Sequence, residues 1–268
     1  MTILLGGSAS PTGWSVQYVE AGFDRVLSAL VEWRRGAGHQ LEVSPPRPFP
    51  QVLRDLVPFE SPWTRELVLP CGTWTAYLNN AVDGGDLTAS ASVIARQLGV
   101  RWVGAEHTLR HGPGHESTQL WVCGPDGQPP SMYERTLAAY AEDGRWGWYE
   151  WGTALSFEDV ARYQARRKRD RFDRPLLLAY LAALGIRADD DAAYGRGVVV
   201  QQRADWHQER PPRTVTLAEA RSELGLGLED EAIPSDRLTV GRTRGSVVEE
   251  VSCRSPISGV GPAPASAS

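Results

Sequence analysis

Three histidines recur at every fourth position near the middle of the chain: His107, His111 and His115, with Glu116 directly after the last one. On a helix this spacing would line up metal ligands, but Gly112-Pro113-Gly114 interrupts any helix there. We therefore expect a polar, glycine-rich loop. Such a loop has two chemical uses: it gathers ligands around zinc, or it supplies a histidine base that a nearby glutamate orients.

Other motifs of known chemistry are incomplete. Asp189-Asp190-Asp191 is typical of an acidic loop after a helix, and Asp83-Gly84-Gly85-Asp86 is typical of a turn. Gly6-Gly7-Ser8 lacks the lysine of a phosphate loop, and the chain has no Gly-x-Ser-x-Gly elbow, His-Glu-x-x-His pair or dinucleotide fingerprint. The histidines also lack the short paired spacings of established metal motifs. The sequence therefore predicts neither a metal nor a cofactor.

Two consecutive helices are expected over residues 156–185, where the pattern is most regular. Ser156 is a suitable N-cap, with Asp159 three positions later, and apolar side chains follow with a helical spacing. The second helix, Leu176–Leu184, is apolar on nearly every side, which is typical of a helix buried in a core. Pro175 and Gly185 mark its two ends.

The first of these helices would carry a local excess of positive charge. Arg162–Arg174 contains 7 basic and 2 acidic residues, whereas the rest of the chain has 21 basic and 31 acidic residues. Three pairs are spaced to form ion pairs along a helix: Glu158 with Arg162, Arg166 with Asp170, and Arg169 with Asp173. We interpret the segment as a solvated face, with two alternatives: a docking site for an acidic protein partner, or a phosphate-binding ridge. The residues that a partner would contact are Arg162, Arg166 and Arg169.

A tryptophan-rich strand precedes these helices. Thr136–Ala141 and Arg145–Trp151 are expected to form a hairpin through Asp143-Gly144, a common hairpin turn. Alternation places Trp146 and Trp148 on one face of the second strand, and Tyr149 and Trp151 on the other. Side chains on the two faces could fill a core or form an exposed platform for a partner, so Trp146, Trp148 and Trp151 are candidate partner-binding residues.

The remaining pattern predicts an α+β fold with a mostly antiparallel sheet and helices packed on one face, because hairpins and helices follow no strict alternation. The other face of such a sheet can be exposed to water. Further strands are expected at 14–19, 65–69, 74–79, 101–105, 119–123 and 198–202. Further helices are expected at 23–36, at 52–56, at 88–98 with Thr88 as cap and Gly99 as stop, and at 216–225 with a Thr216/Glu219 capping box.

Composition limits the class of protein. The chain has 268 residues and a net charge of -5, which argues against a nucleic-acid binder. Its three cysteines, Cys71, Cys123 and Cys253, are widely spaced, which suits a reducing compartment. We find no signal peptide and no apolar run long enough to span a bilayer, so we expect a cytoplasmic protein. The expected organisation is a core domain over residues 1–203, an extension with one helix over 204–250, and a disordered tail over 251–268.

Two stretches resemble an uncharacterised bacterial protein family. One is Trp74-Thr75-Ala76-Tyr77-Leu78-Asn79-Asn80. The other runs from Gly144-Arg145-Trp146 through Leu155-Ser156-Phe157-Glu158, Tyr163-Gln164-Ala165-Arg166-Arg167 and Asp170-Arg171-Phe172 to Gly185-Ile186. A compact, Trp-rich α+β domain is also similar in general character to many toxin-immunity proteins.

The resemblance implies no catalytic residue. Strong scaffold signals beside weak chemical ones favour a non-catalytic cytoplasmic module that binds a protein partner, similar to an immunity protein. The alternative hypothesis is a hydrolase or transferase that uses the loop from His107 to Glu116, in a metal-dependent or a metal-free form. The sequence predicts no oligomeric state.

Overall fold

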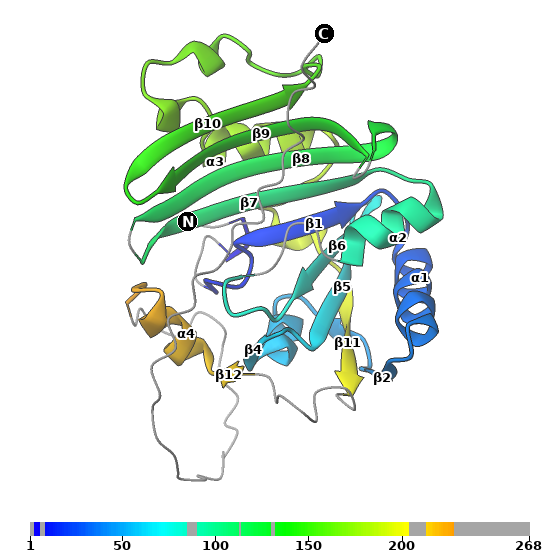
Figure 1. Cartoon of the computed structure of the whole chain (residues 1–268). Coiled ribbons are helices and arrows are strands. Elements are labelled where there is room, and N and C mark those ends of the chain that lie inside the picture. The colour runs from blue at the N-terminus through cyan, green and yellow to red at the C-terminus, as the bar shows by residue number, and fades with distance from the viewer. Residues whose placement is uncertain are drawn as a thin grey trace, which may run out of the picture. The chain divides into compact units, whose positions relative to one another are not determined.

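An antiparallel sheet forms the centre of the fold. The computed structural model describes residues 3–5, 9–84, 90–112, 114–129, 132–203 and 213–227, which all lie in one compact unit. Every strand pairing within the described sheets is antiparallel. The strands lie in the order β10 (Arg145–Gly152), β9 (Tyr133–Glu142), β8 (His115–Gln128), β7 (Trp102–His111), β1 (Ser15–Val19), β6 (Trp74–Asn79), β5 (Arg65–Cys71), β11 (Arg196–Arg203) and β2 (Gln40–Val43), and β3 (Arg47–Pro48) also pairs with β11 (Figure 1).

Helices lie on both faces of this sheet. α1 (Phe23–Gly36) and α2 (Ser90–Leu98) share a hydrophobic core with Val19 and Tyr77, on one face. α3 (Arg174–Ala183) packs on the opposite face, behind β8 and β9 in Figure 1, in a core that includes Val16 and Tyr18. The sheet-rich α+β fold is therefore confirmed, whereas the expectation of helices on one face only is not.

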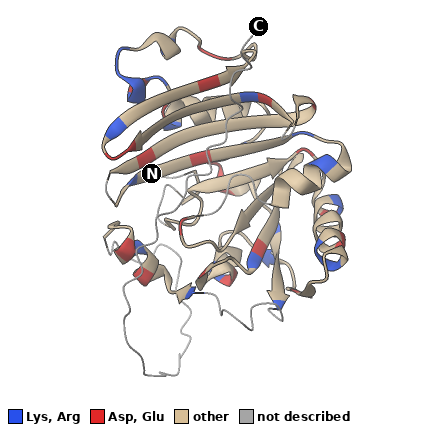
Figure 2. Ribbon diagram, in the orientation of Figure 1, with Lys and Arg blue, Asp and Glu red and all other residues tan. Residues whose placement is uncertain are grey.

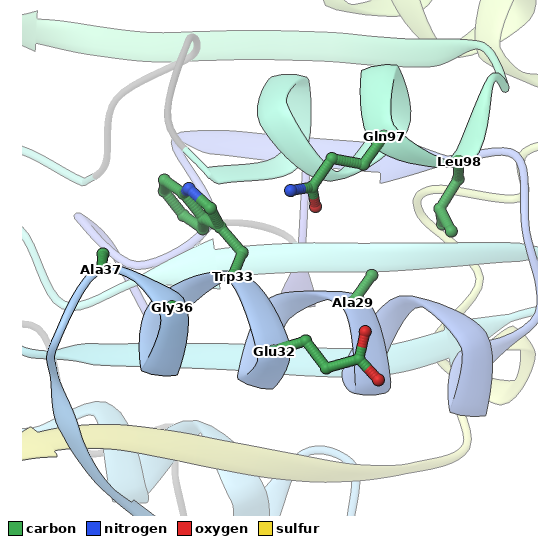
Figure 3. Close-up of a pocket in the computed structure, with 7 residues that line it drawn as sticks. All are labelled: Ala29, Glu32, Trp33, Gly36, Ala37, Gln97 and Leu98. Atoms are coloured by element: carbon green, nitrogen blue, oxygen red, sulfur yellow. The ribbon is translucent and has the colours of Figure 1, made fainter.

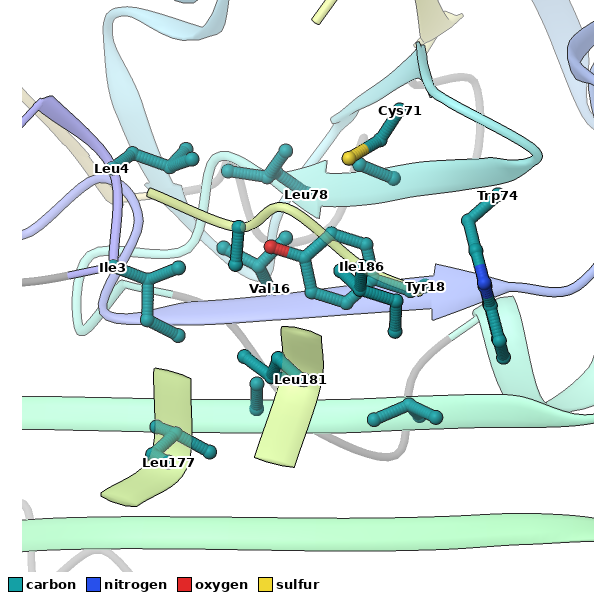
Figure 4. Close-up of a cluster of buried hydrophobic side chains, with 14 of the residues drawn as sticks. Ile3, Leu4, Val16, Tyr18, Cys71, Trp74, Leu78, Leu177, Leu181 and Ile186 are labelled. Carbon is teal, nitrogen blue, oxygen red and sulfur yellow. The ribbon is translucent and has the colours of Figure 1, made fainter. Parts of the chain in front are cut away.

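The larger core lies between the sheet and α3. Leu177 and Leu181 of α3 meet Val16 and Tyr18 of β1 there, and all four side chains are buried (Figure 4). The Tyr18 hydroxyl lies 3.0 Å from that of Tyr194, which in turn donates to a backbone carbonyl. Burial of these hydroxyls is therefore accompanied by hydrogen bonds, as a core requires.

A buried carboxylate joins five elements on the other face. Glu66 of β5 is fully buried and accepts two hydrogen bonds of 2.8 Å from Arg34 of α1. It also accepts from the Tyr77 hydroxyl at 2.6 Å, from the Gln202 amide of β11 at 3.1 Å, and from the Ser90 hydroxyl at the start of α2. A buried charge is tolerated only when it is paired and hydrogen-bonded in this way.

Elements with strong local signals form where the sequence predicts them. α1 spans the predicted range, and α3 begins after the N-cap Asp173 with Pro175 in its first turn. The turn Asp143-Gly144 has two positive φ values, 50° and 72°, as a two-residue hairpin requires. Residues 52–56 lie in a 3-10 helix, Gln51–Leu56. Only one side of α3 is buried, so the expectation of a helix buried on nearly every side is wrong.

The arginine-rich helix predicted over 156–174 does not form. Residues 155–173 are turns with two short 3-10 helices, Arg162–Gln164 and Lys168–Asp170. A long-range contact overrides the local pattern: the buried guanidinium of Arg135 in β9 donates to both carboxylate oxygens of Glu158, at distances from 2.7 to 3.1 Å.

The ion pairs of this segment also differ from the helical ones. The predicted pairs Glu158–Arg162, Arg166–Asp170 and Arg169–Asp173 are replaced by other partners. The observed ion pairs are Arg135–Glu158, Arg162–Asp173, Arg167–Asp170 and Arg169–Asp170. The predicted helical spacing therefore has no counterpart in the structure.

A small second sheet lies toward the C-terminus. β4 (Phe59–Ser61) pairs with β12 (Arg213–Val215), and α4 (Leu217–Glu223) begins with the predicted Thr216/Glu219 capping box. Ala220 of α4 packs on Phe59, which attaches this helix to the core. Several positions named in the sequence analysis fall outside the described residues or at their margins. These are the expected boundaries at 203 and 250, the tail 251–268, Thr88, Gly6-Gly7-Ser8 and Cys253. Among the described residues, no helix has the length and apolar character needed to cross a bilayer.

Candidate functional site

The candidate catalytic histidines lie on a hairpin, not in a free loop. His107 and His111 belong to β7, and His115 begins β8 and pairs with His111. The Nδ1 atom of His107 lies 3.0 Å from the Thr118 hydroxyl, and burial, together with nearby Arg174, lowers its pKa to about 4. The ring of His111 lies against Trp14, at 4.7 Å between centroids.

These side chains do not converge on one point. His107 and Glu106 are adjacent in a strand and therefore point to opposite faces of the sheet. The rings of His111 and His115 lie 5.8 Å apart, and Glu116 is in β8 opposite Ala141 of β9. In the described part of the chain, no group of three or more His, Cys, Asp or Glu side chains is arranged to hold a metal ion. The hydrolase hypothesis gains no support from this arrangement.

The tryptophans of β10 divide between the two faces as their alternation predicts. Trp146 and Trp148 pack against the core that contains α3, and the Trp148 ring lies 5.2 Å from that of Tyr163. The structure therefore places these two candidate residues in packing contacts. Tyr149 and Trp151 lie on the opposite face.

That opposite face forms the candidate site, which we call the open face. In β7 to β10 it has no described helix over its central part, because α1 and α2 pack over β1, β5 and β6 (Figure 1). α2 reaches only the Trp102 end of β7 and the adjoining end of β8. We define the open face by the side chains that register and ring contacts place on it: Glu106, Ser117, Gln119, Trp121, Tyr133, Tyr140, Tyr149 and Trp151.

Aromatic rings cover much of the open face. Tyr133 lies between two indoles, 6.1 Å from Trp121 and 6.3 Å from Trp151, with edge-to-face geometry in both pairs. Tyr140 and Tyr149 are each 38% exposed, whereas the other described Phe, Trp and Tyr side chains are more buried. Such partly exposed Trp and Tyr side chains dominate the binding energy of protein interfaces.

A glycine shapes this aromatic surface. Gly147 of β10 is paired with Tyr140 of β9, and a Cβ atom at Gly147 would lie 2.5 Å from the Tyr140 ring. The ring therefore lies flat across the edge strand, in the space that a side chain would otherwise fill. Tyr140 can hold this position only because residue 147 is glycine.

Polar groups border the aromatic rings. One carboxylate oxygen of Glu106 accepts a 2.9 Å hydrogen bond from the Gln119 amide and a further hydrogen bond from the Ser117 hydroxyl. These two donors come from the neighbouring strand and hold the carboxylate in one orientation. The open face thus combines an aromatic area with an oriented acidic group.

Two hollows lie elsewhere on the same side of the sheet. One, of about 570 Å³, lies between α1 and α2, and Glu32, Trp33, Gln97 and Leu98 project around it (Figure 3). The other, of about 350 Å³, lies between α2 and the β8–β9 hairpin and is lined by Trp102 and Tyr133 among others. Tyr133 therefore connects the second hollow with the open face.

On the α3 side of the sheet, Arg135 and Glu158 form a buried ion pair, and each shifts the pKa of the other. Burial alone would lower the pKa of Arg135, but its hydrogen bonds to Glu158 raise it. Burial alone would likewise raise the pKa of Glu158, but Arg135, the Leu155 amide and the Tyr163 hydroxyl together hold it below its usual value. Both groups therefore stay charged in the folded protein.

Comparison with protein-family models, curated proteins and solved structures finds no match for this chain. The site must therefore be judged from its own geometry.

Sequence reasoning identified Trp151 but missed Trp121, Tyr133 and Tyr140. The alternation of side chains in β8 and β9 could have indicated that these residues share one face of the sheet. Alternation does not indicate which of the two faces another element covers.

Proposed function

We propose that this protein is a cytoplasmic, non-catalytic module that binds another protein on its open face, in the manner of an immunity protein. The observation that carries the proposal is the pair of partly exposed tyrosines, Tyr140 and Tyr149, beside the Trp121–Tyr133–Trp151 aromatic group. Rigid aromatic side chains on a sheet lose little conformational entropy on binding and bury a large area.

The strand arrangement also supports the proposal. Antiparallel sheets can leave one face to water, and β10 is the outermost strand of the large sheet. A partner on the open face would contact side chains from four consecutive strands, β7 to β10, whose relative positions the hydrogen-bond ladders fix. Such a platform needs no rearrangement to bind.

The test is affinity capture from a lysate of the native host with two matched variants. Tyr140→Ser/Tyr149→Ser removes the exposed rings from the open face, whereas Val43→Ser/Val160→Ser removes apolar side chains that are 41% and 51% exposed elsewhere. We expect one protein to be recovered in stoichiometric amount with the wild type and the valine variant. Recovery with the tyrosine variant should fall by at least about tenfold, as expected for the loss of two interface aromatics.

Two outcomes would refute the proposal. The first is equal recovery of the same protein with the wild type and the tyrosine variant. The second is repeated capture without any stoichiometric protein. Matching urea midpoints of the two variants would show that both are folded, because all four substituted positions are partly exposed.

A further inference from the structure

A second surface lies on the α3 side of the sheet, in the segment that the sequence predicted to be helical. Four consecutive cationic residues, Arg166, Arg167, Lys168 and Arg169, are all exposed, and we call them the basic turn. Figure 2 shows this concentration of positive charge beside β10. Arg166 and Arg167 lie in a bend, and Lys168 and Arg169 begin the short 3-10 helix Lys168–Asp170.

The basic turn is fixed at both ends by buried side chains. Before it, Tyr163 is 2% exposed and its hydroxyl lies 2.9 Å from the Glu158 carboxylate and 2.8 Å from the Tyr180 hydroxyl. After it, Phe172 is 1% exposed and packs against Tyr180 of α3. The chain leaves the core at Tyr163 and returns at Phe172.

Hydrogen bonds also brace the base of the turn. Arg171 donates through Nε to the Ala165 carbonyl at 2.9 Å, and Arg162 donates through Nε to the Asp170 carbonyl at 2.8 Å. Arg162 pairs in addition with Asp173. The backbone of the basic turn is therefore ordered before any ligand arrives, so less entropy is lost on binding.

The positive charge of the turn is only partly neutralised. Asp170 pairs with Arg167 at 2.5 Å and with Arg169 at 3.6 Å. In the described part of the chain, Arg166 and Lys168 have no ion-pair partner. Among the described residues, one carboxylate thus pairs with two of the four cations, which leaves a net positive charge on a rigid turn.

We propose that the basic turn docks an acidic segment of a protein partner, a run of Asp and Glu in extended conformation. Guanidinium side chains bind carboxylates through paired, two-point hydrogen bonds. A nucleic acid is disfavoured, because its backbone needs a longer positive track, interleaved with aromatic platforms, than four consecutive cations provide. The proposal is independent of the open face, which lies on the other side of the sheet.

The test measures binding of a fluorescein-labelled hexaglutamate peptide by fluorescence anisotropy at low salt, with a labelled thymidine hexanucleotide as the competing class of ligand. The variant Arg166→Glu/Lys168→Glu reverses both unpaired cations. The matched control Arg187→Glu/Arg203→Glu makes the same change in net charge at arginines that are 66% and 65% exposed elsewhere.

We expect the wild type to bind hexaglutamate, and we expect affinity to fall as salt is raised. Affinity should fall at least about tenfold in Arg166→Glu/Lys168→Glu and less than about threefold in the control, because only the first variant alters the turn. Arg166→Gln/Lys168→Gln repeats the test without charge reversal and should give an intermediate loss.

Three results would overturn the proposal. The wild type could fail to bind the peptide. The two glutamate variants could lose affinity equally, which would indicate an effect of net charge alone. The hexanucleotide could bind as tightly as the peptide, which would indicate that the basic turn binds phosphate groups as well as it binds carboxylates. None of these results bears on the tyrosine variants of the open face, so the two proposals fail separately.

Discussion

Replacing Glu158 with Gln removes one charge from the buried pair that holds residues 155–173 against the sheet. The side chain of Glu158 is 0% exposed and that of Arg135 is 3% exposed. The substitution keeps the size of the side chain and one acceptor oxygen, but it leaves the Arg135 guanidinium without its main counter-ion. Breaking one partner of a buried ion pair in this way costs about 3–5 kcal/mol.

The remaining contacts of Arg135 place the expected cost at the lower end of that range. Arg135 still donates to the carbonyls of Trp151 and Gly152, at 3.2 and 2.9 Å, and Glu150 remains 3.3 Å away. Glu150 is 44% exposed, so water screens most of its attraction. We expect a loss of about 3 kcal/mol in the free energy of unfolding.

Urea denaturation at pH 7, followed by tryptophan fluorescence, measures this loss, and the double variant Arg135→Met/Glu158→Leu is the control. Removal of both charges should restore stability to within about 2 kcal/mol of the wild type. The pKa of Glu158 is lowered in the folded state, so its contribution is present above its ordinary pKa and is lost as pH falls through the folded value. Glu158→Gln should therefore lose less stability than the wild type below about pH 4.5. A loss under about 1 kcal/mol at pH 7 would refute the assigned role of the pair.

Three further changes follow from the same structure. Because burial lowers the pKa of His107 from 6.5 to about 4, the unfolded chain takes up its proton first as pH falls between these values. The free energy of unfolding of the wild type should fall by roughly 2 kcal/mol over this interval, after allowance for partial exposure. His107→Gln should not show this loss, whereas the control His115→Gln should show it as the wild type does. Urea midpoints at the two pH values measure the difference. Gly147→Ala should displace the Tyr140 ring and reduce capture of the partner. The free energy of unfolding should change by less than about 1 kcal/mol, because the end of the ring can move outward. Undiminished capture would contradict the proposed role of the Tyr140 ring. Asp173→Ala removes the N-cap that accepts from the Leu176 amide at 3.1 Å and should cost about 1 kcal/mol by thermal unfolding, and an unchanged midpoint would show that the cap is dispensable.

The sequence predicts well those elements whose signals are local. The hairpin of β9 and β10 follows from Asp143-Gly144, and α3 follows from Pro175, Gly185 and an apolar run. Each of these signals lies within a few residues of the structure that it specifies.

Residues 155–173 show where local reasoning fails. Their helical spacing is genuine, but each helical ion pair is worth only about 0.2–0.5 kcal/mol, whereas separating Glu158 from the buried Arg135 guanidinium would cost about 3–5 kcal/mol. Arg135 lies 23 positions before Glu158, so no local window contains both. The long-range pair therefore determines the backbone.

The open face shows a second limit. Alternation in β10 correctly separates Trp146 and Trp148 from Tyr149 and Trp151, but the exposed face depends on where α3 and residues 155–173 pack. That packing is a property of the topology, which one strand does not encode. The sequence therefore indicated a strand that carries candidate binding residues, but it did not indicate which face of that strand is exposed.

The position of β11 has a consequence for synthesis of the protein. β11 lies between β5 and β2, yet it is made more than a hundred residues after both of them. Until the ribosome has delivered Arg203, β2 has no partner strand within the described sheet, and one edge of β5 remains unpaired. A nascent chain that stalls before Arg196 therefore exposes two open strand edges, the kind of surface that chaperones protect and that aggregation uses.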